Sequence, residues 1–224
     1  MVDKKIIILM GPIGSGKDTQ ADILAEKFGL YRFRTSKLLE EKFNNAKPEA
    51  SDYEQLQKEK VMWTGGILNT PSWVFSVVKE KVEEVASTGQ GIIFSASPRT
   101  LFEAENMTPL LENLYGKDSI RILLVSLSEE ESIKRNSKRL VCKANSHPIS
   151  PDLLEKGIKE CPFDGSEFVT RALDKPETIK IRYQEYLQRT APIFDYLKNR
   201  GYQIDEVNGE QSIEKVAEEI SLKL

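Results

Sequence analysis

The sequence predicts an α/β fold in which helices cover both faces of a parallel sheet. Apolar runs typical of buried strands alternate with segments of helical periodicity along most of the chain. A glycine-rich turn joins the first strand directly to the first helix, as a strand–helix unit requires. The 224 residues suffice for one such domain with small insertions, and 39% hydrophobic and 30% charged residues are typical of a globular protein.

The first half of the chain is predicted to supply two strands and four helices. The apolar runs at 5–10 and 91–95 are predicted as buried parallel strands. Pro71 stands in the first turn of one helix, and Lys47-Pro48 separates two others, because proline is accepted at a helix start but breaks a helix interior. The four helices are predicted over residues 17–28, 35–43, 52–63 and 71–87.

The second half continues the alternation around one irregular segment. Ser128, followed by three glutamates, predicts the start of a helix that reaches Arg139. Residues 140–173 lose periodicity and are predicted to form an inserted small subdomain, which contains both cysteines and the only histidine. Further strands are predicted over 120–127 and 202–207, and further helices over 101–115 (with a bend at Pro109), 175–199 and 212–222.

Charge and composition limit the expected partners. A formal net charge of -3 gives no overall electrostatic case for binding nucleic acid or an anionic membrane surface. No apolar stretch approaches the roughly 20 residues of a membrane span, and the N-terminus lacks the pattern of a signal peptide. Two cysteines in a chain of this length indicate a reducing, cytoplasmic setting, and the lack of a heptad pattern favours a monomer.

Residues 11–17 carry the phosphate-loop pattern Gly-x4-Gly-Lys, between an apolar strand and a helix as that pattern demands. Its glycines let backbone N–H groups turn inward around an anion, and the positive end of the helix faces the same anion. Lys17 adds a mobile charge over the outer phosphates. Contacts with the nucleotide are therefore predicted at Gly11, Gly14, Ser15, Gly16, Lys17, Asp18 and Thr19.

Asp18 departs from the strict pattern, in which a serine or threonine offers a hydroxyl to magnesium. Thr19, one residue later, is a candidate to supply that hydroxyl. The carboxylate of Asp18 either holds a cation near the phosphates or favours the first turn of the helix electrostatically. The sequence leaves both interpretations open.

The chain resembles adenylate kinases and the related nucleoside monophosphate kinases over nearly its full length. The resemblance implies the P-loop kinase fold, which has a five-stranded parallel core, a small acceptor-binding helical region and an inserted, hinged lid. It implies one kinase unit over 1–224, with its core at 1–34, 88–139 and 174–224, its acceptor-binding region at 35–87 and its lid at 140–173. The resemblance depends on an ordered set of segments: Gly11–Gln20, Phe33–Leu39, Gly91–Thr100, Arg135-x3-Arg139, Phe168–Arg171, Thr178–Tyr183 and Thr190–Ile193.

The resemblance implies transfer of the terminal phosphoryl group of ATP to a nucleoside monophosphate, AMP by default, with Mg²⁺ and lid closure. Such a transfer needs positioning and charge neutralisation rather than a nucleophilic side chain, and arginines supply bidentate phosphate contacts. The residues implied for the transfer are Lys17, Arg99, Arg139, Arg171 and Arg182. Those implied for the donor also include Arg135 and Gln211, and those for the acceptor are Arg34, Thr35, Arg99 and Glu103.

The sequence departs from the family pattern on the acceptor side. Glu40 replaces an arginine that grips the acceptor phosphate, and Ser95 replaces an aspartate that is an outer partner of magnesium, for which Asp18 is a candidate substitute. Arg32 and Arg34 are the nearest candidates for the missing phosphate contact.

Glu103 stands where a glutamine reads the acceptor base. An ionised glutamate only accepts hydrogen bonds, so it favours guanine over adenine if it faces the base. The alternatives are a slightly different alignment or a mediating water. Two rival functions stay open: a P-loop kinase with another acceptor, such as GMP or another small molecule, and a nucleotide-binding protein that has lost transferase activity.

Two further features have alternatives that the sequence leaves open. The lid pattern Cys142-x2-Asn145 and Cys161-x2-Asp164 resembles the zinc site of metal-bearing relatives, with His147 as a candidate fourth ligand. A cluster that has lost its metal and is held by hydrogen bonds is the other interpretation. Trp63 and Trp73, around Gly65-Gly66, are predicted to pack in the core or to stack on a base.

Overall fold

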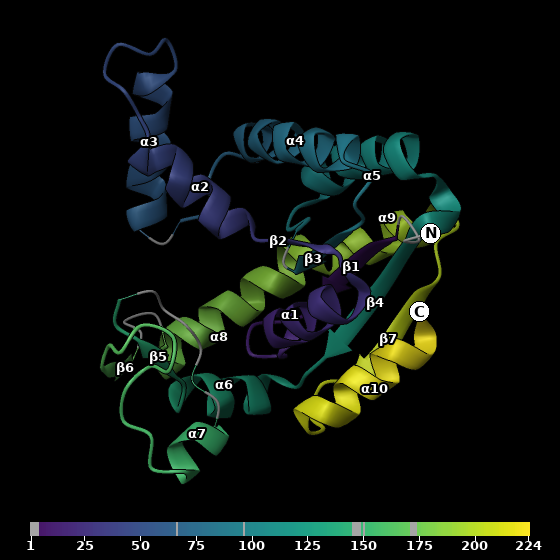
Figure 1. Cartoon of the computed structure of the whole chain (residues 1–224). Helices are drawn as coiled ribbons and strands as arrows, with labels where there is room; N and C mark the ends of the chain where they lie inside the picture. The colour runs from purple at the N-terminus through teal and green to yellow at the C-terminus, as the bar shows by residue number, and fades with distance from the viewer. Residues whose placement is uncertain (1–4, 66, 96, 145–148, 150, 171–173) are drawn as a thin grey trace.

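The computed structural model describes residues 5–65, 67–95, 97–144, 149, 151–170 and 174–224. Its main sheet has five strands, all paired in parallel, in the order β2-β3-β1-β4-β7 (Figure 1). This order confirms the predicted α/β fold with a five-stranded parallel core. The strands are β1 (Ile6–Met10), β2 (Tyr31–Phe33), β3 (Ile92–Ser95), β4 (Ile120–Ser126) and β7 (Ile204–Asn208).

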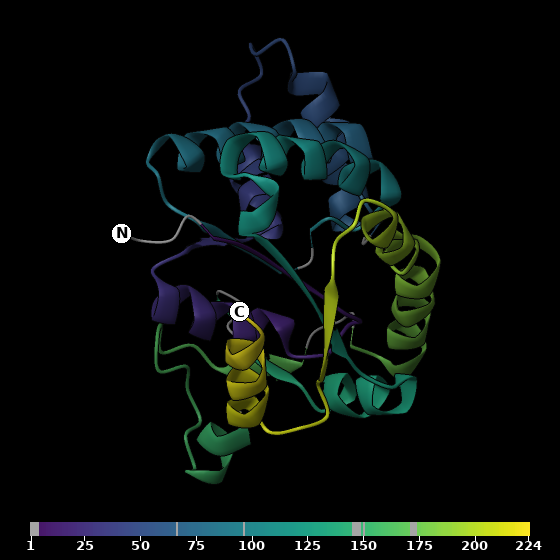
Figure 2. The same ribbon diagram turned by 90° about the vertical axis from the view of Figure 1, so that its right-hand side faces the viewer.

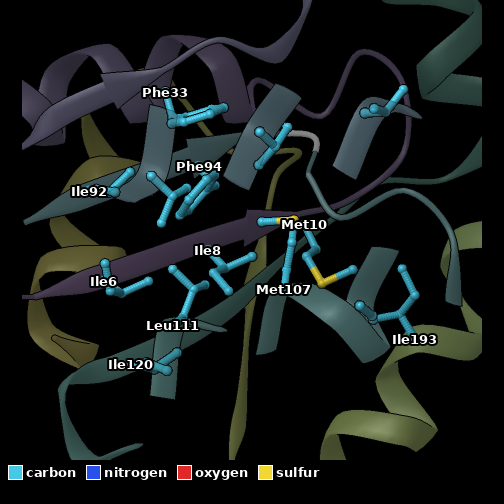
Figure 3. Close-up of a cluster of buried hydrophobic side chains, with 14 of the residues drawn as sticks. Ile6, Ile8, Met10, Phe33, Ile92, Phe94, Met107, Leu111, Ile120 and Ile193 are labelled. Atoms are coloured by element: carbon cyan, nitrogen blue, oxygen red, sulfur yellow. The ribbon is translucent and has the colours of Figure 1, made fainter. Parts of the chain in front are cut away.

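Helices cover both faces of this sheet, as the apolar runs of its central strands require. All five residues of β1 are buried, and alternate side chains point to opposite faces. Ile6, Ile8 and Met10 pack with α4, α5 and α9, whereas Ile7 and Leu9 pack with α1 and α10 (Figures 2 and 3). The helices are α1 (Lys17–Phe28), α4 (Pro71–Ser87), α5 (Leu101–Tyr115), α9 (Pro192–Asn199) and α10 (Ile213–Lys223).

Two insertions extend from the carboxyl ends of the strands, on the left of Figure 1. The first, which we term the helical arm, follows β2 and consists of α2 (Thr35–Asn44) and α3 (Tyr53–Thr64). The second, which we term the hairpin subdomain, follows α6 (Glu129–Ser137) and contains β5 (Leu140–Cys142), α7 (Pro151–Glu155) and β6 (Phe168–Thr170). β5 and β6 pair antiparallel over a separate small core of Cys142, Ile149 and Cys161. Because loops at the carboxyl ends of parallel strands meet along one edge, this edge is where a ligand site is expected.

Most predicted elements are confirmed within a residue or two, and three details differ. The strand Tyr31–Phe33 has too few residues to give a pattern and was not predicted. The prediction that a helix reaches Arg139 is wrong, because α6 ends at Ser137 and the Arg139 N–H turns back to the carbonyl of Asn136 at 3.1 Å. α5 runs from Leu101 to Tyr115 with Pro109 inside it, as predicted, and the bend at Pro109 stays a prediction.

The predicted helix over 175–199 is divided into α8 (Pro176–Glu185), a π-helical turn (Tyr186–Thr190) and α9. Pro192 has no N–H to donate and its ring excludes the carbonyl one turn back, so the chain widens before it. The Ala191 N–H accordingly donates to the Tyr186 carbonyl at 3.0 Å. In the part of the chain that the structure describes, no helix combines the length and apolar character needed to cross a membrane.

Candidate active site

The turn between β1 and α1 has the backbone geometry of an anion cradle. Gly11, Gly14 and Gly16 have φ angles of 148°, 81° and 85°, which side chains other than hydrogen rarely allow. A Cβ at Gly11 would lie 2.3 Å from the Val125 carbonyl oxygen. A Cβ at Gly14 would lie 2.3 Å from Nδ2 of Asn136. The glycine spacing therefore reflects both the turn itself and the close approach of β4 and α6.

Lys17 lies at the centre of a cationic cluster. Its ammonium donates to the Pro12 carbonyl at 3.0 Å, across the mouth of the loop. The pKa of Lys17 is lowered to about 8, mainly by burial and also by the charges of Arg99, Arg182 and Arg139, against the opposing charge of Asp18. Arginines from three distant parts of the sequence thus lie close enough to Lys17 to act on it. Four of the five residues predicted for the transfer are brought together, and the fifth, Arg171, lies outside the described residues.

Asp18 is tied to the ends of two neighbouring strands. Its Oδ1 accepts a hydrogen bond from Oγ of Ser95 at 2.5 Å and forms an ion pair with Arg32 at 2.9 Å. Partial desolvation by the neighbouring groups opposes the charged form, but Lys17, the Ser95 hydroxyl and Arg32 together hold the pKa of Asp18 below its ordinary value. Asp18 is therefore ionised beside the phosphate cradle at neutral pH.

Three residues hold the turn that carries Arg99. The carboxylate of Glu103 accepts the Arg99 N–H at 2.9 Å and the Thr100 hydroxyl at 3.0 Å. The Thr100 hydroxyl accepts the Glu103 N–H at 3.3 Å and so caps the start of α5, while the Glu103 carboxylate reaches the N–H of Arg99, one residue before the N–H that a capping box uses. From the π-helical turn, Thr190 donates its hydroxyl to the Arg99 carbonyl at 2.9 Å.

Each carboxylate oxygen of Glu103 therefore has a hydrogen-bond donor within its own turn. It is 6% exposed, and burial raises its pKa, although these hydrogen bonds and the charge of Arg99 act in the opposite direction. These contacts indicate that Glu103 stabilises the turn that carries Arg99. Its role in reading the acceptor base stays a prediction.

Arg139 and Arg135 are held by different partners. Asp174, almost fully buried, receives Arg139 in a bidentate ion pair at 2.7 and 2.9 Å. Arg135 bridges Glu131 of its own helix and the Gly209 carbonyl after β7, at 3.0 and 2.8 Å. Near that carbonyl, Gln211 donates its amide to Asn208 and Glu219. The two residues predicted for the donor thus lie in one region, where α6 meets the loop after β7.

α6 also supports the phosphate loop through two buried polar residues that the sequence did not single out. Ser132 donates its hydroxyl to the Ile13 carbonyl at 2.7 Å, and Asn136 lies directly against Gly14. Both side chains are essentially inaccessible to solvent. Their spacing of four places them on one helix face, and polar residues there are the only sequence signal that could have found them.

On the acceptor side, the predicted cations are already paired. Arg34 and Arg32 both contact Oδ1 of Asp22 at 2.7 Å, and Glu40 is exposed. The Thr35 hydroxyl shares a 2.6 Å hydrogen bond with Ser97, which is buried.

The two tryptophans, Trp63 in α3 and Trp73 in α4, both pack against Phe43 of α2. Phe43 stacks on Trp73 with ring centroids 5.6 Å apart and lies tilted against Trp63 at 6.0 Å. These contacts give both side chains the core role that was one of the two predicted alternatives.

The hairpin subdomain brings three metal-ligand residues together. The ligand atoms of Cys142, Cys161 and Asp164 all lie within 4.8 Å of one another. The Cys142 thiol donates to Asp164 at 3.2 Å, and the Ser166 N–H and hydroxyl donate to the same carboxylate. A tetrahedral zinc site with Zn–S bonds of about 2.3 Å has ligand atoms about 3.8 Å apart, so a small contraction would suffice. The fourth candidate, His147, lies outside the described residues.

Comparisons with known proteins agree with this geometry. A family model described as adenylate kinase matches residues 9–202. The adenylate kinase of Elusimicrobium minutum (strain Pei191) is 33% identical over 217 residues, covering 96% of each chain. The adenylate kinase of Archaeoglobus fulgidus is 34% identical over 217 residues, covering 96% of this chain and 95% of its own. That of Kosmotoga olearia is 32% identical over 219 residues, covering 96% of each. With the phosphate loop, the five-stranded parallel sheet and the arginine cluster all present, this chain belongs to the adenylate kinase family.

Proposed function

We propose that this chain transfers the terminal phosphoryl group of ATP to AMP, with Mg²⁺ and closure of the hairpin subdomain as a lid. The observation that carries the proposal is the cluster of positive charge at Lys17, where Arg99, Arg139 and Arg182 act on a lysine in an anion cradle. Four cations around one loop suit two polyphosphate groups that must approach each other, because each phosphate would otherwise repel the next.

The chemistry that these residues support is a direct displacement. The acceptor phosphate already carries anionic oxygens, so its attack on the terminal phosphorus needs no side chain to remove a proton. The bond from that phosphorus to the bridging oxygen breaks, and the leaving diphosphate keeps the electron pair. Lys17 and the arginines neutralise the charge that spreads over the equatorial oxygens, and lid closure keeps water from competing as the acceptor.

The oxygen donors at the start of α1 fit Mg²⁺, which prefers carboxylates, hydroxyls and phosphate oxygens in an octahedral set. Asp18 and Thr19 are the residues that would hold it. When bound, the ion neutralises charge on the donor phosphates and fixes their orientation.

The acceptor is tested by a coupled assay of the four common nucleoside monophosphates with MgATP. We expect AMP to react at least tenfold faster than GMP, CMP or UMP, since Glu103 is occupied by its own turn. A preference for GMP would favour a kinase with another acceptor. Binding of ATP with no transfer to any of the four would favour a nucleotide-binding protein without transferase activity.

The lid cluster is proposed to bind zinc through Cys142, Cys161 and Asp164, with His147 as the fourth ligand. The support is the convergence of the three described ligand atoms within 4.8 Å. Metal analysis of protein purified without a histidine tag tests it, with Cys161→Ser as the matched control. We expect close to one zinc per wild-type chain. Less than about 0.2 zinc per chain would leave a metal-free, hydrogen-bonded cluster.

The division into a core, an acceptor-binding region at 35–87 and a lid at 140–173 is part of the same proposal, as are a monomeric state and a cytoplasmic location. The separate small core of the hairpin subdomain supports its movement as a unit. Light scattering at micromolar concentration tests the oligomeric state, and we expect the mass of one chain of 25.4 kDa.

A further inference from the structure

Asp18 occupies an unusual place for an acidic side chain. It directly follows Lys17, where the phosphate-loop pattern puts the residue that binds the nucleotide's magnesium. A carboxylate one residue from an anion cradle repels bound phosphate unless a cation lies between them. The position is therefore unfavourable for a nucleotide alone and favourable for a nucleotide that arrives with a divalent cation.

The contacts of Asp18 turn one oxygen toward the protein and leave the other available. Oδ1 accepts both hydrogen bonds, from Ser95 at the end of β3 and from Arg32 at β2. Within the part of the chain that the structure describes, Oδ2 has no hydrogen-bond partner. The side chain is 69% exposed. One fixed oxygen and one exposed oxygen are the arrangement of a preorganised monodentate ligand.

The ion pair with Arg32 does not by itself explain why residue 18 is an aspartate. The Arg32 side chain, 13% exposed, also pairs with Asp22 at 2.7 Å, one helical turn further along α1. Asp22 can therefore balance the charge of Arg32 in the absence of Asp18. The Ser95 hydroxyl differs from Arg32, because the hydrogen bond that it makes, at 2.5 Å, goes to Asp18.

We propose that Oδ2 of Asp18 holds the divalent cation that accompanies the donor nucleotide, either directly or through a cation-bound water. Ser95 and Arg32 are positioning residues that fix the carboxylate through Oδ1. The inference rests on the proposed function, since it takes a magnesium–nucleotide complex as the donor. It predicts that Asp18 makes binding depend on the metal, with opposite effects on the metal-free and metal-bound nucleotide.

Calorimetric titration of Asp18→Asn with ATP, in the absence of AMP, tests this dependence. Each protein is titrated in buffer freed of divalent ions by a chelating resin and again with excess Mg²⁺, and the ratio of the two dissociation constants is compared. Removing the carboxylate should strengthen binding of metal-free ATP and weaken binding of MgATP. We expect the ratio to fall at least fivefold relative to wild type, while the melting temperature stays within a few degrees.

Asp22→Asn is the matched control, because it removes an equal charge from the same helix and the same arginine. Its ratio should stay within twofold of wild type. Ser95→Ala should give an intermediate fall, because it frees the carboxylate to turn. The inference is overturned if Asp18→Asn leaves the ratio unchanged, weakens both forms equally, or behaves as Asp22→Asn does. A wild-type protein that binds no ATP in either buffer overturns the proposed function and this inference with it.

Discussion

The donor cradle and the helical arm use their charged residues in different ways. Around the cradle, the charges of Arg99, Arg139 and Arg182 all act on Lys17. At the start of the helical arm, Arg34 is instead paired with Asp22, and Glu40 is exposed. The cradle thus gathers several cations where an anion binds, whereas the cation at the start of the arm is already paired with a carboxylate. The comparison indicates that phosphate binding is built mainly on the core and that the arm contributes shape and packing.

Replacement of Lys17 by methionine is expected to have the largest effect on the cradle. The variant loses the charge that faces the outer phosphates while keeping a side chain of similar length. We expect kcat/KM to fall roughly 10³-fold, in line with the loss of a preorganised donor to a developing charge. A coupled assay gives the rate, and circular dichroism checks that the fold is intact. An unaltered rate would place the donor site elsewhere.

Replacement of Arg99 by lysine tests whether one core residue serves the acceptor phosphate. Lysine keeps the charge but loses the bidentate contact, so we expect KM for AMP to rise roughly 30-fold while KM for ATP stays within threefold. Arg189→Lys is the control, since Arg189 pairs with Glu185 in the neighbouring helix. Equal rises in both Michaelis constants would argue against a dedicated acceptor contact.

The lowered pKa of Lys17 predicts alkaline loss of nucleotide binding. The free protein loses the Lys17 proton above a pKa of about 8, and bound phosphate restores it, so affinity falls as pH rises. We expect MgATP affinity to fall roughly tenfold between pH 7.5 and 9.5. Folding stability has the opposite sign: it rises between about 8 and the ordinary value of 10.5, because the unfolded chain binds more protons.

Lys17→Arg is the matched variant for the pH experiment, because arginine stays charged throughout this range. Its affinity for MgATP should vary less than threefold over the same two pH units, whatever its absolute value. Protons that belong to the nucleotide are common to both proteins and cancel in the comparison. Parallel pH profiles for the two proteins would mean that Lys17 is not the titrating group.

Ser132→Ala tests the support that α6 gives to the cradle. It leaves the buried Ile13 carbonyl without its 2.7 Å donor, at a cost of about 1 kcal/mol. We expect the dissociation constant for MgATP to rise roughly fivefold, while that for AMP does not change. Ser221→Ala, which removes a hydroxyl from α10, should change neither. A loss of melting temperature with unchanged ATP binding would reduce Ser132 to a purely structural role.

Glu103→Gln should have the smallest effect, and it separates the two roles considered for this residue. A glutamine can accept the Arg99 N–H through its amide oxygen and donate its NH2 group to the Thr100 hydroxyl, so the turn that carries Arg99 should survive. We expect kcat, KM for AMP and the AMP-to-GMP preference all to stay within about twofold of wild type. A tenfold shift in the base preference would show that Glu103 reads the base after all.

The pH dependence of stability gives a second measurement on Glu103. Burial raises its pKa in the folded chain, so the stability it contributes is present at acid pH and is lost as pH rises through that pKa. The stability of wild type relative to Glu103→Gln should therefore be greater at pH 4 than at pH 7. Thermal unfolding at the two pH values measures this difference.

The sequence predicted the parts of the site that depend on neighbours in the chain. The Gly-x4-Gly-Lys spacing predicted both the turn and its helix, because the loop geometry is set by residues 11–17 themselves. The convergence of arginines was predicted by resemblance, and the structure brings Arg99, Arg139 and Arg182 to Lys17.

The residues that support the site could not be predicted, because each depends on a partner far away in the chain. Ser132 is 119 residues from Ile13, and Thr190 is 91 residues from Arg99. Asp174 is 35 residues from Arg139, and nothing in their spacing joins them. Glu103 is the reverse case, because its Thr-x-x-Glu pattern with Thr100 is local and indicates a capped helix start. The hypothesis that Glu103 reads the base did not take this pattern into account.

The central claim is that one connected site binds two nucleotides end to end, with the cradle on one side and the arginines facing it. Calorimetric titration with two adenosines joined by five phosphates tests this most directly. One molecule should bind per chain, at least 100-fold more tightly than ATP, and it should exclude both ATP and AMP. Binding no tighter than that of ATP, or binding of two molecules per chain, would contradict the claim.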